Sequence, residues 1–191
     1  KAIKYYKRCL KIQEQSIGKE HIDTAATYNS MGNVYLKNGK FQEALKYYEV
    51  TLKIRVKVLG KNHPDVASSY NNVGLVHQNL NSLESALKCY KKSLEINKSN
   101  FGDYHPSLAT CYHNMGSVYY RQQNLKEALK HYQMALEINL KHYGEVHPDV
   151  ATGYNNIGNI YDAEGRMDQA LKYYTKSLDI KRKIYGENHN S

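Results

Sequence analysis

Histidine returns once in every 42 residues of this sequence, and histidine is a frequent ligand of zinc. Each copy follows a glycine by three residues. If the repeat consists of packed helices, successive histidines stand roughly 10 Å apart, because packed helices lie about 8–10 Å from each other. That separation is too large for two side chains to share one zinc ion, so we predict no metal site. We expect these residues to form hydrogen bonds at helix ends: His21, His63, His105, His147 and His189.

Cysteine and the common catalytic motifs offer no other reactive centre. The three cysteines, Cys9, Cys89 and Cys111, lie far apart and form no C-x-x-C pair, so we expect reduced thiols in an intracellular compartment. The sequence contains no G-x-S-x-G, no phosphate-binding loop and no H-E-x-x-H. We therefore predict that the chain is not an enzyme and needs no cofactor.

The histidines belong to a repeat that covers the chain. The segment from Gly60 to Ala67 returns, shifted by 42 residues, from Gly102 to Ala109, and again from Gly144 to Ala151. A fixed period of this length indicates a stack of similar structural units. The positions that keep the register include glycine at 32, 74, 116 and 158, alanine at 44, 86, 128 and 170, and tyrosine at 48, 90, 132 and 174.

Within one period, apolar residues recur at steps of three and four residues in two segments, which predicts two helices per repeat. No segment alternates long enough to make a strand, and none is apolar for the eighteen or so residues that a membrane helix needs. The predicted helices cover residues 1–17, 22–38, 41–59, 64–80, 83–101, 106–122, 125–143, 148–164 and 167–185.

The residues between these segments are typical of helix ends. Pro64 and its equivalents Pro106 and Pro148 suit the first position of a helix, where no backbone N–H is needed. The glycines at 18, 60, 102, 144 and 186 follow the second helix of each pair, and we expect left-handed C-terminal caps there. The sequence thus predicts one solenoid over residues 1–191: an orphan second helix in 1–18, full repeats in 19–60, 61–102, 103–144 and 145–186, and a truncated junction in 187–191.

This pattern resembles the tetratricopeptide repeat. Tyr28 stands at the family's Trp position, Met31-Gly32 at its Leu-Gly, and Ala44 and Tyr48 at its small and aromatic positions. The 42-residue period and the Asn-Asn-Val-Gly string are similar to repeats of the kinesin-light-chain type, although those tend to have alanine in place of the glycine. The resemblance implies an all-α, right-handed α-solenoid of antiparallel helix pairs, about four and a half repeats long.

The resemblance also implies a binding surface, because the first helix of each pair lines a concave groove in that family. An asparagine amide can pair with both polar groups of a peptide backbone, so a row of them suits an extended peptide. Alternatively, the asparagines bond to the neighbouring helix and only fix the stacking, above all Asn72, Asn114 and Asn156. The groove positions implied are Asn29, Asn33, Lys37, Asn71, Gln78, His113, Ser117, Arg121, Asn155 and Asn159.

The net charge of +9 lies outside that groove. Segments that contain the first helices sum to −1, and those that contain the second helices sum to +10. Lysines on solvated helix faces explain such an excess, and binding of nucleic acid or another anionic partner to the convex side is a weaker alternative.

Together these features predict a cytoplasmic, non-catalytic scaffold, excised from a longer protein, that binds a peptide of a partner protein in its groove. A structural spacer, or a scaffold that self-associates end to end through the apolar faces of its terminal helices, is the alternative.

Overall fold

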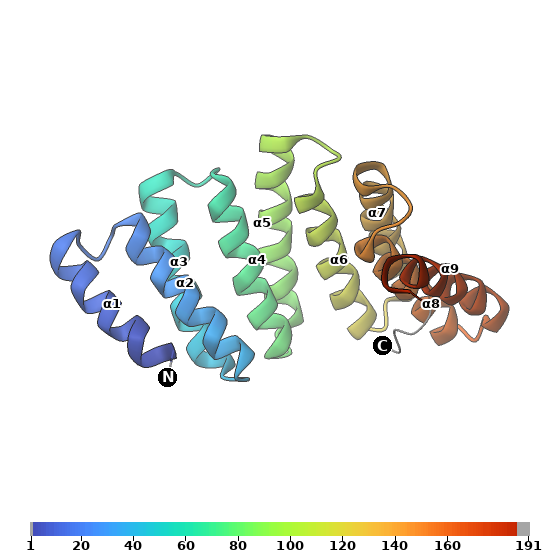
Figure 1. Cartoon of the computed structure of the whole chain (residues 1–191), viewed down its shortest axis with the longest axis horizontal. Helices are drawn as coiled ribbons and strands as arrows, with labels where there is room; N and C mark the ends of the chain where they lie inside the picture. The colour runs from blue at the N-terminus through green and yellow to red at the C-terminus, as the bar shows by residue number, and fades with distance from the viewer. Residues whose placement is uncertain (1, 187–191) are drawn as a thin grey trace. The chain divides into compact units, whose positions relative to one another are not determined.

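The computed structural model describes residues 2–186, and this part of the chain is all helix and turn (Figure 1). Every helix but the first starts at the residue the sequence predicts, and the first helices of the pairs end one residue earlier than expected. Lys1 and residues 187–191, which include His189 and the predicted truncated junction, lie outside the described part. The helices are α1 (Ala2–Ser16), α2 (Ile22–Lys37), α3 (Phe41–Leu59), α4 (Pro64–Asn79), α5 (Leu83–Phe101), α6 (Pro106–Arg121), α7 (Leu125–Tyr143), α8 (Pro148–Ala163) and α9 (Met167–Tyr185).

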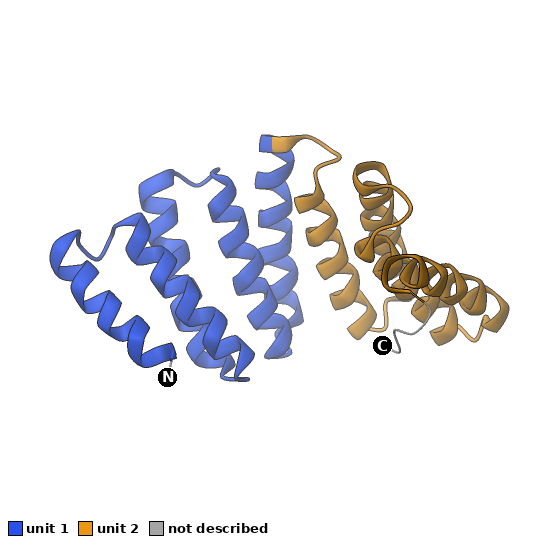
Figure 2. Cartoon of the chain, viewed as in Figure 1, with its two compact units in different colours: residues 1–100 blue, residues 101–191 orange. Residues whose placement is uncertain are grey.

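The chain forms two compact units, residues 1–100 and residues 101–191 (Figure 2). In unit 1, α1 packs on α2, α2 on α3 and α3 on α4; in unit 2, α6 packs on α7, α7 on α8 and α8 on α9. Each helix is amphipathic and therefore needs a neighbour on its apolar side, which is the reason why consecutive helices pack. The predicted all-α helical-repeat fold is confirmed, whereas a single continuous solenoid stays a prediction.

Histidine is the N-terminal cap of every first helix. The Nδ1 atoms of His21, His63, His105 and His147 accept hydrogen bonds of 3.2, 3.1, 3.2 and 3.2 Å from the backbone N–H two residues later. Nδ1 takes the place of the oxygen that Ser or Asp supplies in most caps. In unit 2 the rings of His105 and His147 also stack on Phe101 and Tyr143, at centroid distances of 4.2 and 3.9 Å. The predicted role at helix ends is confirmed for these four histidines.

The glycines that end the second helices correct one expectation. Their φ angles are positive, as predicted, but Gly60 has ψ 156°, Gly144 ψ −175° and Gly186 ψ 168°, which is extended and not left-handed helical. Gly60 N–H still closes the last turn on the Val56 carbonyl at 3.1 Å. The chain then leaves the helix extended, since it must reach the next histidine cap in three residues. Only glycine adopts this backbone region readily.

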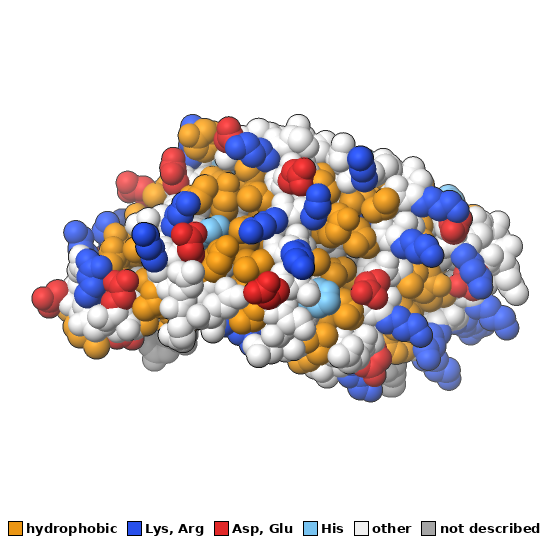
Figure 3. All heavy atoms as spheres, turned by 180° about the vertical axis from the view of Figure 1, so that it is seen from behind, with side chains coloured by type: hydrophobic (Ala, Val, Ile, Leu, Met, Phe, Trp, Pro, Cys, Tyr) orange, Lys and Arg blue, Asp and Glu red, His pale blue; other side chains and the backbone are white. Residues whose placement is uncertain are grey.

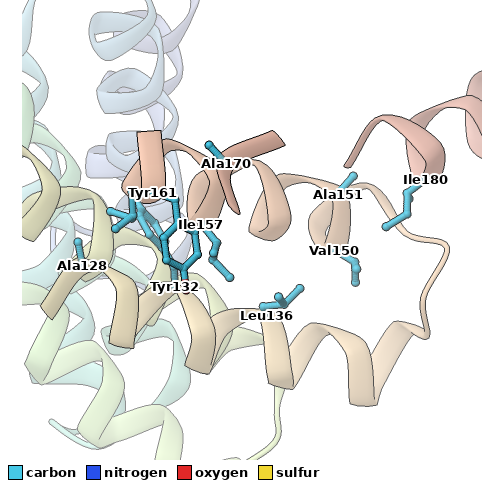
Figure 4. Close-up of a cluster of buried hydrophobic side chains, with 10 residues drawn as sticks. Ala128, Tyr132, Leu136, Val150, Ala151, Ile157, Tyr161, Ala170 and Ile180 are labelled. Carbon is cyan, nitrogen blue, oxygen red and sulfur yellow. The ribbon is translucent and has the colours of Figure 1, made fainter. Parts of the chain in front are cut away.

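A glycine on each first helix makes room for a tyrosine ring of the following helix. An added Cβ atom at Gly32, Gly74, Gly116 or Gly158 would come within 2.6–2.8 Å of the ring of Tyr48, Tyr90, Tyr132 or Tyr174. The small residues therefore let the two helices approach, and the rings fill the space between them. In unit 2, Tyr132 lies with Ile157 and Tyr161 in a buried cluster, and Leu136 and Val150 lie further along it (Figure 4).

Candidate functional site

The polar rows predicted for the groove lie on the first helices of both units. Asn29, Asn33 and Lys37 follow one another at four-residue spacing on α2, and His113, Ser117 and Arg121 do the same on α6. Residues four apart share one face of a helix, so each set forms a row along that face. Lys37 and Arg121 are exposed at the C-terminal end of each row. Half-buried residues complete the set on α4 and α8: Asn71, Gln78, Asn155 and Asn159.

Tyrosine hydroxyls hold several of these polar groups. Tyr48 donates a hydrogen bond of 2.6 Å to Asn33 Oδ1, and Tyr174 donates one of 2.8 Å to Asn159 Oδ1. In the second repeat Leu75 occupies the matching position, and Tyr90 donates to Gln78 Oε1 at 2.9 Å instead. These amides therefore have a fixed orientation. The amide nitrogens are not involved in these bonds.

Tyr48, Tyr132 and Tyr174 remain protonated donors over the physiological range, because burial raises the pKa of each. Burial raises the pKa of Tyr48 to about 12. Burial also raises the pKa of Tyr132 to about 12, and a hydrogen bond with Ser117 opposes this rise. Ser117 is the residue of α6 that corresponds to Asn33, so the same pairing recurs in unit 2.

A second type of hydrogen bond ties neighbouring first helices together. Asn72 Nδ2 of α4 donates to Asn29 Oδ1 of α2 at 3.0 Å, and Asn156 Nδ2 of α8 lies 3.2 Å from His113 Nδ1 of α6. Asn72 and Asn156 thus bond to the neighbouring helix, as the stacking alternative expected. The role of the ten predicted positions in peptide binding stays a prediction.

A pocket of about 340 Å³ opens in unit 2 between α6, the end of α7 and the start of α8. We call it the Asn139 pocket. Its walls carry hydroxyl, amide, imidazole and aromatic groups and one carboxylate. Its lining residues are Pro106, Ser107, Ala109, Thr110, His113, Asn139, Tyr143, Asp149 and Thr152.

Sequence reasoning missed Asn139 because it considered only the first helices. The signal lies in the repeat register: positions 97 and 139 are asparagine where the first full repeat has Arg55, and Gly153 corresponds to Ser69. In unit 1, Arg55 Nη1 donates to the Asp65 carbonyl at 3.0 Å and contacts Ser69 Oγ at 2.9 Å. A long basic side chain thus bridges α3 and α4 at the place where unit 2 has a short amide and a glycine.

The titratable groups of the Asn139 pocket differ in exposure. Burial lowers the pKa of His113, and the Asp149 carboxylate only partly opposes this effect, so the imidazole is neutral near pH 7. The Asp149 side chain is 59% exposed, and its Oδ2 lies 3.8 Å from His147 Nδ1. Among residues 2–186, no three His, Cys, Asp or Glu side chains come together in a way that could hold a metal ion.

A family model described as tetratricopeptide repeat matches residues 1–57, 27–99, 65–141 and 149–191. These matches cover nearly the whole chain. The chain belongs to the tetratricopeptide repeat family. Proteins of this family are typically non-catalytic scaffolds that bind other proteins, and no protein of curated function matches the sequence at a significant level.

Solved structures agree with this assignment. The BtubC (BKLC) protein from P. vanneervenii is 25% identical, with a TM-score of 0.85 over 100% of this chain and 76% of that one. A Podosopora anserina protein provisionally described as a kinesin light chain, with nearly identical tetratricopeptide-like repeats, is 21% identical, with a TM-score of 0.78 over 96% of this chain and 87% of that one. The apo form of RapI is 22% identical, with a TM-score of 0.82 over 96% and 64%. At these identities the last two show the shared fold alone. The predicted resemblance of the repeats to the kinesin-light-chain type is confirmed, since the family model matches and kinesin-light-chain-like repeat proteins are among the similar structures.

The outer surface of this tetratricopeptide protein has two further features. Lys and Arg side chains on one face are scattered among acidic and apolar ones and form no single patch there (Figure 3). The first and last helices expose apolar side chains, among them Tyr5 at 72% and Leu171 at 67%. End-to-end self-association through these faces stays a prediction. No helix of the described part is long and apolar enough to cross a membrane.

Proposed function

We propose that this chain is a non-catalytic scaffold that binds a peptide segment of a partner protein along the polar rows of its first helices. The observation that carries the proposal is the pair of amides, Asn33 and Asn159, whose oxygens are held by Tyr48 and Tyr174. The first-helix faces are the surface that the family uses for ligands, and this chain lines them with oriented amides.

The held oxygen determines what each amide can recognise. With Oδ1 occupied by the tyrosine hydroxyl, the two N–H donors of Nδ2 remain for a partner. Their natural acceptor is a backbone carbonyl of an extended peptide. Because the orientation is fixed before binding, little side-chain entropy is lost when the contact forms.

The end of each row adds a charge. Lys37 stands four residues after Asn33, and Arg121 four residues after Ser117. A carboxylate of the peptide, or its C-terminus, would meet these exposed cations. Neutral hydrogen bonds contribute only about 0.5–1.5 kcal/mol each, so we expect affinities near the micromolar range.

The test replaces the donor and keeps the fold. Peptides are first selected from a random library on the immobilised whole chain, and their affinity is then measured for Asn33→Asp and Asn159→Asp, singly and combined. An aspartate is the same size as asparagine and still accepts the tyrosine hydroxyl, but it cannot donate and it repels a carbonyl. We expect the double variant to bind at least tenfold more weakly, with an unchanged circular-dichroism spectrum.

Gln42→Glu and Gln169→Glu are the matched controls, since they make the same amide-to-carboxylate change at exposed positions on α3 and α9. Peptides that bind the double variant and the control pair equally well would refute the proposed binding face.

A further inference from the structure

We propose that the Asn139 pocket of unit 2 receives the guanidinium group of an arginine side chain from the bound partner segment. This inference rests on the proposed function, since it names one residue type that the peptide would carry. It starts from the repeat register, which gives the pocket a filled counterpart inside the same chain.

The filled counterpart is Arg55 in unit 1. Position 55 and position 139 are two repeats apart, and so are Asp65 and Asp149. Arg55 extends from the end of α3, and its Nη1 reaches the carbonyl of Asp65 in the first turn of α4. The backbone at this site in unit 1 therefore binds a guanidinium group that the chain itself supplies.

Unit 2 keeps the aspartate in the first turn of the following helix, Asp149, and lacks the arginine side chain. Asn139 is too short to cross to α8 as Arg55 crosses to α4. The result is an open volume of about 340 Å³. This lies at the lower end of the roughly 300–1,000 Å³ that ligand pockets span, a size suited to one large side chain.

The lining of the pocket favours a cation with several donors. Asp149 is the one charged residue among the lining residues, and Asn139, Ser107, Thr110 and Thr152 supply further oxygen acceptors. His113 does not oppose a cation, because its imidazole is held neutral by burial. The planar guanidinium has five N–H donors in a fixed fork, so it can use several of these acceptors at once.

Arginine fits better than lysine for two reasons. The counterpart in unit 1 is an arginine, and its contact there is with a carbonyl and a hydroxyl, which suit a forked planar donor. In addition, the oxygen acceptors of the pocket come from α6, α7 and α8, and a guanidinium with five N–H donors can reach more of them at once than an ammonium group can.

The experiment uses the whole chain labelled with ¹⁵N and a small probe, N-acetyl-arginine amide. The lysine and citrulline amides serve as comparison probes, because citrulline keeps the shape of arginine without its charge. We expect saturable shifts of the backbone amides in residues 107–113 and 149–153, with arginine binding at least tenfold more tightly than citrulline and more tightly than lysine. Equal binding of lysine or citrulline, or shifts elsewhere, would overturn the assignment.

Two variants test the pocket itself. Asn139→Arg fills the pocket as Arg55 fills its counterpart, and we expect it to abolish the shifts; Gln133→Arg adds the same charge at an exposed position on the same helix and should leave them. Asp149→Asn should weaken arginine binding at least threefold, and it decides the question if Asn139→Arg folds poorly. Undiminished binding by Asp149→Asn and by a folded Asn139→Arg would also contradict the proposal.

The Asn33→Asp, Asn159→Asp double variant separates this inference from the proposed function. If it loses the selected peptides but keeps the arginine shifts, the binding face and the pocket are both supported. If the selected peptides bind normally to the parent chain and the arginine probe causes no saturable shift, only the pocket proposal fails.

Discussion

The α3–α4 junction of unit 1 and the α7–α8 junction of unit 2 use the same repeat positions in opposite ways. In unit 1, Arg55 bridges the two helices and bonds to the start of α4. In unit 2, the short Asn139 leaves a pocket there, yet α7 and α8 still pack on each other. The difference indicates that two consecutive helices pack on each other without an arginine bridge, so this repeat position is available for binding at Asn139.

The largest expected effect is on the filled junction. Arg55→Ala removes two hydrogen bonds from a charged donor and the packing of its stem, so we expect a loss of about 2 kcal/mol in the free energy of unfolding. Nε of Arg55 is buried without a hydrogen-bond partner among the described residues, which costs free energy in the folded state. The substitution removes this cost, so the expected loss of stability is not larger. Urea unfolding followed by circular dichroism measures it.

Asn139→Ala is the matched variant at the open junction, and we expect a change within about 0.5 kcal/mol. A loss at Asn139 as large as that at Arg55 would show that the two junctions are equivalent in stability and would remove the basis of the comparison.

The second expectation compares an enclosed tyrosine with one on the last helix. Gly74→Ala places a Cβ atom 2.7 Å from the ring of Tyr90, which is fully buried, and 3.2 Å from Cys89 Cβ. Overpacking of this kind costs about 1–3 kcal/mol, and the better helix propensity of alanine returns at most about 1 kcal/mol. We therefore expect a net loss of about 1 kcal/mol or more in the free energy of unfolding.

Gly158→Ala meets the ring of Tyr174 at 2.6 Å, but that ring is half-buried on α9 and has room to move outward. We expect a change within about 0.5 kcal/mol, because ring movement and helix propensity offset each other. Thermal unfolding of both variants in parallel is the measurement. A greater loss for Gly158→Ala than for Gly74→Ala would contradict the difference drawn between the two tyrosines.

The smallest expected effect concerns pH. Burial lowers the pKa of His113 below its ordinary value of 6.5, so the unfolded chain takes up this proton at a higher pH than the folded chain does. Stability is therefore lost as the pH falls below 6.5, by at most about 1.4 kcal/mol per pH unit for one proton.

His113→Asn introduces the residue that unit 1 has at Asn29, and it should flatten the loss of stability between about pH 7.5 and about pH 5.5. The two proteins differ only at position 113, so the difference between the two curves isolates His113. Parallel curves over this range would show that burial of His113 has no energetic consequence.

The repeat made most of the fold predictable from sequence. The starts of the helices follow from Pro64 and its equivalents and from the histidine before each first helix, because these residues satisfy or replace the free N–H groups of a helix end. The backbone at Gly60 was predicted only in the sign of φ. Its ψ depends on the path to the next cap, and that path is a property of the assembled pair.

The candidate site was less predictable than the fold. The row positions on the first helices follow from their register, but the partner of each amide does not. Tyr48 donates its hydrogen bond to Asn33, whereas Tyr90 donates to Gln78. The change follows from Leu75, which replaces the asparagine found at position 33. The Asn139 pocket lies where the first full repeat has Arg55, and the open space is visible only when the helices are placed side by side.

The fixed sequence offsets of the contacts have a consequence for how such a chain changes length. The histidine cap reaches 2 residues along the chain, the tyrosine–asparagine bond 15, and the bond between neighbouring first helices 43. Duplication or excision of one whole 42-residue block preserves every one of these offsets. The loss of a few residues inside a helix instead changes the offset of every contact whose two residues lie on either side of the deletion. Recombination between blocks in the same register thus yields folded products of new lengths, and small insertions are confined to the turns.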